Sequence, residues 1–191
     1  MPSLVLLTLL AWAIFEFWLL LRDRASGTGS TARDRGTRRF LVLAWLAAVA
    51  IAVLTAAAGR GGRGGPVAAI GGWALPTGLI VMWAGVVIRV WAVVVLGSAF
   101  RTTVEVDAGQ QVVDRGPYRF VRHPSYSGLL IIAAGTGLAL GSWIALAALA
   151  LLPLAALLRR IAVEEAALAE VLGQPYLSYA ERTKRLVPGI W

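Results

Sequence analysis

The sequence predicts an all-α integral membrane protein with about five transmembrane helices. Hydrophobic residues make up 59% of the 191 residues, and the mean hydropathy is +0.75, well above the apolar content of ordinary soluble domains. Apolar runs of about 20 residues, the length needed to cross a bilayer, recur along the chain. Most arginines lie between alternate runs, and such one-sided positive charge is typical of multi-pass membrane proteins.

The apolar runs define the spans in order. The first three helices are expected at 4–21, 40–58 and 76–97. The glycine-rich stretch 59–72 before the third span is expected to be a loop or a partly inserted segment. Residues 126–158 carry no charge and break at Gly141-Ser142, which predicts a tight hairpin of two short helices.

The positive charges predict the orientation of these spans. Of the 18 Lys and Arg residues, six lie in 22–39, four in 98–122 and five from Arg159 onward, against only Arg60 and Arg63 on the opposite side. By the positive-inside rule the N-terminus lies outside and the tail in the cytoplasm, in what we expect to be a prokaryotic plasma membrane. Positive charges follow the first apolar run, as in an N-out anchor rather than a cleaved signal peptide.

Composition also excludes several kinds of site and partner. There are no cysteines and one histidine, which excludes disulfides, zinc–thiolate sites, a cysteine nucleophile and a multi-histidine site, so no bound metal is expected. The net charge of +8 is attributed to arginines facing anionic lipid, and no nucleic-acid partner is expected.

Two ionisable residues fall within spans, where charge is costly and often functional. They are Glu16 in the first and Arg89 in the third. The structural alternative is that each is interfacial, or that the two pair with each other inside the bundle, and this alternative is preferred over a chemical role.

The stretch YRFVRHPSYSG, residues 118–128, holds the single histidine at the start of the fourth span. His123 precedes a proline, which biases it away from helical geometry, and Pro124 suits the first turn of a helix. The free N–H groups of that helix would then offer an anion site beside His123, Arg122 and Tyr126. An interfacial belt of Arg and Tyr explains the same residues equally well.

A second polar stretch, LLRRIAVEEAALAEVLG, follows the hairpin. If the fifth helix continues past the membrane, Arg160 and Glu164 lie four residues apart on one face. An exposed helical salt bridge is the simpler explanation of this spacing. Glu165, Ala169 and Leu172 then continue an amphipathic helix that ends at Gly173 as a C-cap.

Taken in order, these features resemble one known family. A Gly-Pro-Tyr turn, RHPSYSG, a two-helix hairpin, RRIAVEEAAL and GQPYLSYAERTKRLVPGIW together resemble the isoprenylcysteine carboxyl methyltransferase family over roughly residues 95–191. The resemblance implies an integral membrane enzyme that transfers a methyl group from S-adenosyl-L-methionine. The cofactor pocket would face the cytoplasm, and a lipidic or prenylated acceptor would enter from the bilayer between helices.

The resemblance also implies residue roles. Arg160 matches the arginine at the substrate carboxylate and Glu164 the acidic residue that binds the cofactor, so these two are the implied catalytic pair. Gln110 stands where the family often has a histidine, in a strand-like segment whose backbone holds the adenosine. The residues implied to bind the cofactor are Gln110, Gln111, Val112, Val113, Tyr118, His123, Pro124, Ser125, Tyr126 and Glu164.

The sequence predicts two parts in the chain. Residues 1–97 form three N-terminal spans with their loops, and 98–191 form the catalytic region of linker, hairpin and C-terminal cytoplasmic helices.

A phospholipid amine or a small thiol could replace the carboxylate acceptor. A sterol-type membrane reductase would instead bind NADPH, whose 2′-phosphate Arg119, Arg122 and Arg185 could contact. A non-catalytic membrane scaffold is the remaining alternative.

Overall fold

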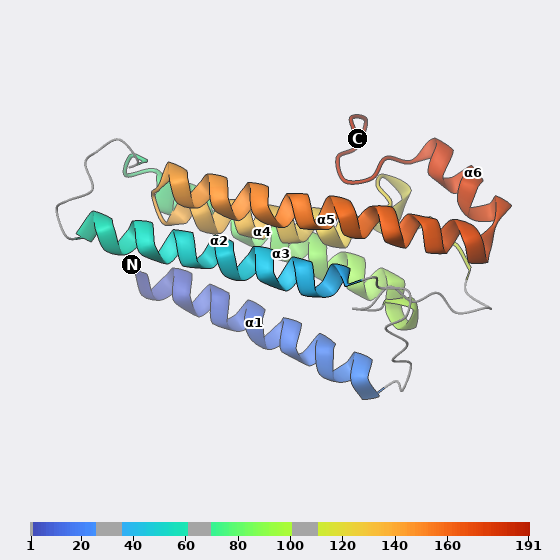
Figure 1. Ribbon diagram of the computed structural model, residues 1–191, viewed down its shortest axis with the longest axis horizontal. Coiled ribbons are helices and arrows are strands. Elements are labelled where there is room, and N and C mark those ends of the chain that lie inside the picture. The colour runs from blue at the N-terminus through green and yellow to red at the C-terminus, as the bar shows by residue number, and fades with distance from the viewer. Residues whose placement is uncertain (1, 26–35, 61–69, 101–110) are drawn as a thin grey trace.

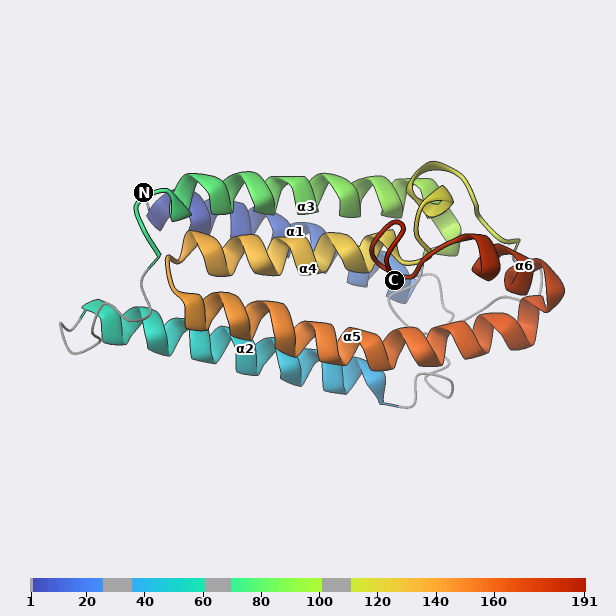
Figure 2. The same ribbon diagram turned by 90° about the horizontal axis from the view of Figure 1, so that it is seen from above.

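Long helices running side by side make up most of the protein (Figures 1 and 2). The computed structural model describes residues 2–25, 36–60, 70–100 and 111–191. Two short 3-10 helices, η3 (Gly97–Ala99) and η4 (Gly116–Arg119), lie between α3 and α4. The α-helices are α1 (Pro2–Ala25), α2 (Thr37–Arg60), α3 (Ala74–Leu96), α4 (Pro124–Ala139), α5 (Trp143–Leu172) and α6 (Gln174–Arg182).

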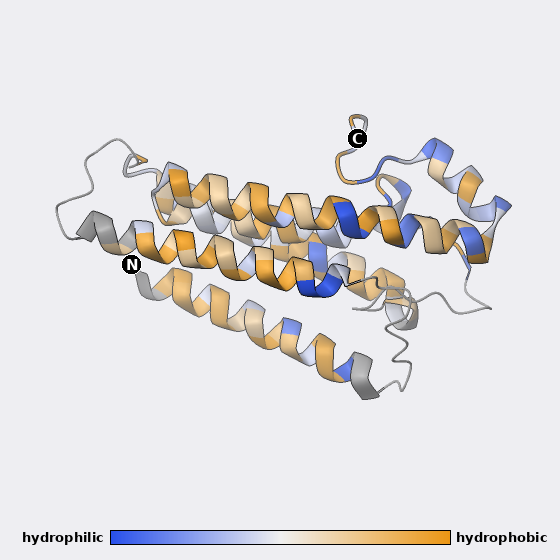
Figure 3. Ribbon diagram, in the orientation of Figure 1, coloured by the Kyte–Doolittle hydropathy of each residue, from blue (hydrophilic) through white to orange (hydrophobic). Residues whose placement is uncertain are grey.

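The apolar helices have the lengths that a membrane protein needs. Among the described residues, α1, α2, α3 and α5 are long and apolar enough to cross a bilayer. Helix α4 has 16 residues, so it is about 24 Å long and shorter than the hydrocarbon core of about 30 Å. Hydrophobic residues run along all five helices, whereas α6 is largely hydrophilic (Figure 3). Many of the large apolar side chains face outward, among them Ile14 at 69% exposed and Ile80 at 70%.

The predicted hairpin at Gly141-Ser142 is confirmed. Gly141 adopts a positive φ of 69°, which glycine tolerates without steric cost, and the Ser142 side chain caps α5 by accepting from the Ala145 N–H. The prediction of two short helices was wrong for the second, because α5 runs for 30 residues to Leu172. It is long enough to carry its last turns beyond the membrane, where Gly173 ends it as predicted.

Glycines allow α3 and α4 to pack closely. A Cβ added at Gly128 would lie 2.8 Å from the Gly85 carbonyl oxygen, and one at Gly135 would lie 2.5 Å from the Met82 nitrogen. Small residues at such crossings let helix backbones approach within a membrane. This contact fixes the start of α4 against α3, and α2 packs along α5.

The segment after α6 runs back to the start of α4. The Arg122 N–H donates to the Lys184 carbonyl at 2.7 Å, and the His123 N–H donates to the Arg185 carbonyl at 3.0 Å. The two polar stretches of the sequence therefore meet at one end of the bundle. Helix α2 begins at Thr37, so Arg38 and Arg39 belong to this helix and not to the predicted loop.

Candidate active site between the bundle and the polar end

His123 lies at the N-cap of α4 with φ −123° and ψ 55°, as the following proline predicts. Its side chain is 4% exposed, with Nδ1 4.0 Å from Glu164 Oε1 and Nε2 3.3 Å from Glu165 Oε1. The ring stacks on Tyr126 at a centroid distance of 5.5 Å. The predicted neighbourhood of His123, Tyr126 and Glu164 is thus present in the structure.

Backbone N–H groups predicted to be free at the start of α4 donate hydrogen bonds within the protein. Pro124 has no N–H, and the N–H groups of Tyr126 and Ser127 both donate to the His123 carbonyl, at 3.0 and 3.1 Å. These bonds reduce the number of free N–H groups in the first turn, and the anion site at the helix N-terminus stays a prediction.

Glu165 joins three basic side chains, a role the sequence analysis missed. Its Oε1 accepts from Arg122 Nε at 2.8 Å and lies 3.3 Å from His123 Nε2, and its Oε2 accepts from Arg185 Nε at 2.9 Å. The carboxylate therefore connects the start of α4, helix α5 and the segment after α6. The one sequence feature that could have indicated this role is that Glu165 directly follows Glu164.

The Tyr126 hydroxyl connects the two residues of the implied catalytic pair. It accepts a hydrogen bond from Arg160 Nε at 2.8 Å and donates one to Glu164 Oε2 at 2.6 Å. Arg160 is 3% exposed, so the alternative of an exposed surface salt bridge was wrong. Both bonds involve a charged partner, which makes them stronger than bonds between neutral groups.

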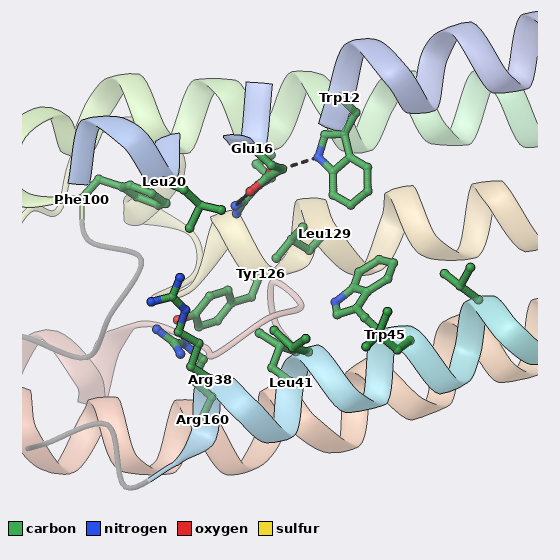
Figure 4. A pocket seen from close by; sticks show the side chains of 14 residues that line it. Trp12, Glu16, Leu20, Arg38, Leu41, Trp45, Phe100, Tyr126, Leu129 and Arg160 are labelled. Carbon is green, nitrogen blue, oxygen red and sulfur yellow. Dashed lines mark hydrogen bonds and ion pairs between the residues drawn. The ribbon is translucent and has the colours of Figure 1, made fainter. Parts of the chain in front are cut away.

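An apolar cavity of about 350 Å³ opens onto this tyrosine (Figure 4). Arg38 and Arg160 approach Tyr126 at its polar end, and Trp12 and Trp45 face each other further along with ring centroids 5.7 Å apart. The lining comes from five helices and from the residue after η3: Trp12, Glu16, Leu20, Arg38, Leu41, Val42, Trp45, Leu46, Val49, Arg89, Phe100, Tyr126, Leu129 and Arg160.

Glu16 and Arg89 form the internal pair that was the preferred structural alternative. Arg89 Nη2 lies 2.6 Å from Glu16 Oε2, and the Arg89 Nε also donates to this carboxylate. Arg89 Nη1 donates to Ser125 Oγ at 2.5 Å, and Trp12 Nε1 donates to Glu16 at 3.0 Å. The pair ties α1 to α3 and α4 and lines the cavity. The first two helices carry part of the site, which their apolar sequences did not indicate.

The other predicted cofactor residues are placed less directly. Tyr118 is buried and its hydroxyl donates to the Ala92 carbonyl at 3.3 Å, while Ser125 is engaged by Arg89. Pro124 is buried in the first turn of α4. The backbone of Gln111, Val112 and Val113 belongs to no assigned helix or strand, so the strand-like segment stays a prediction; Gln110 lies outside the described residues.

One buried polar atom near this cluster lacks a hydrogen-bond partner among the described residues, the Tyr176 hydroxyl at the start of α6. Burial raises the pKa of Tyr176, and the charges of Glu165 and Glu164 act in the same direction. The neighbouring Tyr179 is satisfied, since its hydroxyl donates to the Tyr118 carbonyl at 2.7 Å, and burial raises its pKa to about 12. An unpaired buried hydroxyl is costly, which makes Tyr176 a candidate contact for a polar ligand.

Tyr126, Arg160 and Glu164 lie in a region of recognisable similarity to known proteins. Residues 78–170 match the model of the isoprenylcysteine carboxyl methyltransferase family. The chain is 34% identical over 118 residues to protein-S-isoprenylcysteine O-methyltransferase A of Arabidopsis thaliana, covering 61% of this chain and 60% of the plant protein. It is 32% identical over 107 residues to the protein-S-isoprenylcysteine O-methyltransferase of Schizosaccharomyces pombe, covering 49% of this chain and 45% of the yeast protein.

The fold is similar to a solved structure of the same kind. The eukaryotic intramembrane Ras methyltransferase ICMT matches with a TM-score of 0.63 and 26% identity, over 78% of this chain and 52% of that one. The chain spans about three fifths of the length of its plant relative. It is a multi-pass integral membrane protein. Over residues 78–170 the chain matches the isoprenylcysteine carboxyl methyltransferase family, and its fold is similar to that of a solved structure of this kind.

Proposed function

We propose that this protein transfers a methyl group from S-adenosyl-L-methionine to the carboxylate of an isoprenylcysteine-like lipid acceptor. One observation carries the proposal. The Tyr126 hydroxyl bonds both Arg160, which lines the apolar cavity, and Glu164, which lies on the side of His123. An acceptor held on one side of this tyrosine and a methyl donor on the other would meet there.

The cavity supports the acceptor half of the proposal. Its apolar walls, including Trp45 and Leu46, suit a hydrocarbon chain arriving from the bilayer, and its volume is at the lower end of small-molecule pockets. Arg160 and Arg38 bring positive charge to one end. A planar guanidinium binds a carboxylate through two parallel hydrogen bonds, so Arg160 would bind and orient the acceptor's carboxylate.

The polar side fits the methyl donor, which presents an ammonium, a carboxylate and an adenosine and supplies an electrophilic methyl group when bound. The side chain of Glu164 is 28% exposed and would pair with the ammonium. Tyr176 has a buried hydroxyl that lacks a partner among the described residues, and it would bond a polar atom of the donor. We infer that His123, Tyr126, Glu164 and Tyr176 contribute to this site.

Such a reaction asks the protein mainly for positioning. An ionised carboxylate is already nucleophilic, so no side chain has to remove a proton. The negative charge of the acceptor's carboxylate and the positive charge of the donor's sulfonium cancel as methyl transfer proceeds. A site from which water is excluded favours such a step. Holding both reactants in line is worth effective molarities of about 10⁵ M or more. Arg160 and Glu164 would supply this alignment, and Tyr126 would hold these two relative to each other.

The alternatives fit the polar end less well. In the reductase alternative, Arg122 and Arg185 would contact a 2′-phosphate, but both donate to Glu165. If the acceptor were a phospholipid amine, the buried Arg160 would bind a phosphate in place of a carboxylate. The comparison of acceptors described below distinguishes these two possibilities.

We further propose that the N-terminus lies outside and the C-terminal region in the cytoplasm of a prokaryotic plasma membrane. Arg159 lies over the ring of Phe40 at the start of α2, and the Arg185 carbonyl accepts from the His123 N–H at the start of α4, so basic residues gather at the end that would face the cytoplasm.

The test begins with calorimetric binding of S-adenosyl-L-methionine and of NADPH to the detergent-purified protein. Binding of the first alone is expected; binding of NADPH alone would overturn the proposal. Methyl transfer to a farnesylated cysteine, to phosphatidylethanolamine and to a small thiol then identifies the acceptor class. Turnover on the amine or thiol but not on the carboxylate would contradict the acceptor assignment.

Substitutions then separate the two halves of the site. Arg160→Ala should abolish turnover and leave donor binding largely intact, with exposed Arg159→Ala as the matched control. Glu164→Ala and His123→Ala should weaken donor binding itself, with exposed Glu170→Ala as the control. Equal donor affinity in Arg160→Ala, Glu164→Ala and His123→Ala would refute the role assignments.

A further inference from the structure

The segment Leu186–Trp191 presents apolar side chains outside any helix. Its backbone closes a turn in which the N–H groups of Leu186 and Val187 both donate to the Trp191 carbonyl at 2.9 Å. Leu186 is buried, whereas Val187, Ile190 and Trp191 are 45%, 76% and 41% exposed. We refer to these three exposed residues as the apolar tip.

The apolar tip lies at the level where the spanning helices end. In Figures 1 and 2 the turn, drawn in dark red, projects from the bundle at the same distance along its long axis as the beginning of α2. Figure 3 shows hydrophobic helices giving way to hydrophilic residues at this level. Tryptophan is enriched at this depth of membrane proteins, because its ring is apolar and its N–H can bond headgroups or water.

Basic residues surround the apolar tip. Lys184 is exposed and Arg185 is half-buried, and the Arg185 guanidinium lies 5.1 Å from the centroid of the Trp191 ring. Apolar side chains flanked by basic ones match a bilayer surface, where acyl chains lie beneath anionic headgroups. We propose that the apolar tip inserts into the interfacial layer of the bilayer at the polar end of the bundle, with the exposed Lys184 facing anionic headgroups.

This insertion would connect the membrane surface to the candidate active site. Just before the apolar tip, the Leu186 carbonyl accepts from Ser127 Oγ at 2.7 Å and the Arg185 carbonyl accepts from the His123 N–H at 3.0 Å. Arg185 also donates to Glu165. Anchoring the turn would therefore hold His123 at a fixed depth. The insertion itself does not depend on the proposed function.

The absence of cysteine from the chain allows a clean test. Ile190→Cys is labelled with an environment-sensitive fluorophore and the full chain is reconstituted into vesicles of phosphatidylcholine and an anionic phospholipid. Ser178→Cys, exposed on α6, is the aqueous control, and Ile80→Cys, exposed on α3, is the control within the bilayer. We expect the label at 190 to be blue-shifted relative to that at 178. Spin labels at headgroup level should quench it more strongly than labels near the bilayer centre, the reverse of the order at 80.

Two results would overturn the proposal. The label at 190 could be quenched by aqueous iodide as strongly as that at 178, which would place the turn in water. It could instead be protected from iodide and unaffected by both spin-labelled lipids, which would indicate a protein contact such as a second copy of the chain. Val187→Cys, also on the apolar tip, repeats the measurement if Ile190→Cys lowers the Tm.

Discussion

Replacing Tyr126 by phenylalanine deletes one oxygen and, with it, the connection between Arg160 and Glu164. The variant loses the hydrogen bond from Arg160 Nε at 2.8 Å and the one to Glu164 Oε2 at 2.6 Å, while the ring can keep its stacking on His123. Hydrogen bonds to charged groups contribute about 1.5 kcal/mol or more each. Two such bonds correspond to about 3 kcal/mol, so kcat/KM should fall about 10²-fold.

The assay is transfer of a radiolabelled methyl group to a farnesylated cysteine in reconstituted membranes, with the Tm measured in parallel. Tyr179→Phe is the matched control, because it removes a buried hydroxyl that donates to the Tyr118 carbonyl at 2.7 Å. It should lower stability by about 1 kcal/mol and leave kcat/KM unchanged. If kcat/KM of Tyr126→Phe stays within about three-fold of the wild type, a change below about 0.7 kcal/mol, the reasoning is refuted.

Three further predictions concern the elements that hold the site together. Glu165→Gln removes the charge shared by three basic side chains and should lower the Tm and weaken donor binding in calorimetry, whereas exposed Glu170→Gln should change neither. Glu16→Leu leaves buried Arg89 unpaired from α1 and should destabilise by about 3–5 kcal/mol, and adding Arg89→Leu should restore much of that in thermal unfolding. Gly135→Ala forces a Cβ to within 2.5 Å of the Met82 nitrogen and should cost about 1–3 kcal/mol, whereas Gly72→Ala, with nothing within 4 Å, should be neutral by the same measurement.

Local chemistry explains why much of the fold could be predicted. Apolar runs long enough to span a bilayer form helices because no water is present to bond an open backbone. Pro124 starts α4 because proline suits the first turn of a helix and biases His123 before it away from helical geometry, and Gly141 and Gly173 end helices through positive φ. Each of these boundaries depends on a few neighbouring residues, so each was visible in the sequence.

The same local reasoning misjudged pairs whose partners are distant in sequence. The spacing of Arg160 and Glu164 indicated an exposed helical salt bridge, yet Arg160 is buried and both residues bond a tyrosine more than 30 positions earlier. Glu165 was assigned only to the polar face of an amphipathic helix, because its partners Arg122 and Arg185 lie before α4 and beyond α6.

By itself the sequence determined the fold class, the helix ends at Gly141 and Gly173 and the order of polar motifs, because helix formation and membrane insertion act on contiguous residues. The tertiary structure alone decided which polar groups meet. It brought Glu16 to Arg89 across the bundle, placed Trp12 and Trp45 along one cavity, and set Tyr126 between Arg160 and Glu164. These contacts depend on how the helices pack and on the glycine-lined approach of α4 to α3, which no spacing along a single helix specifies.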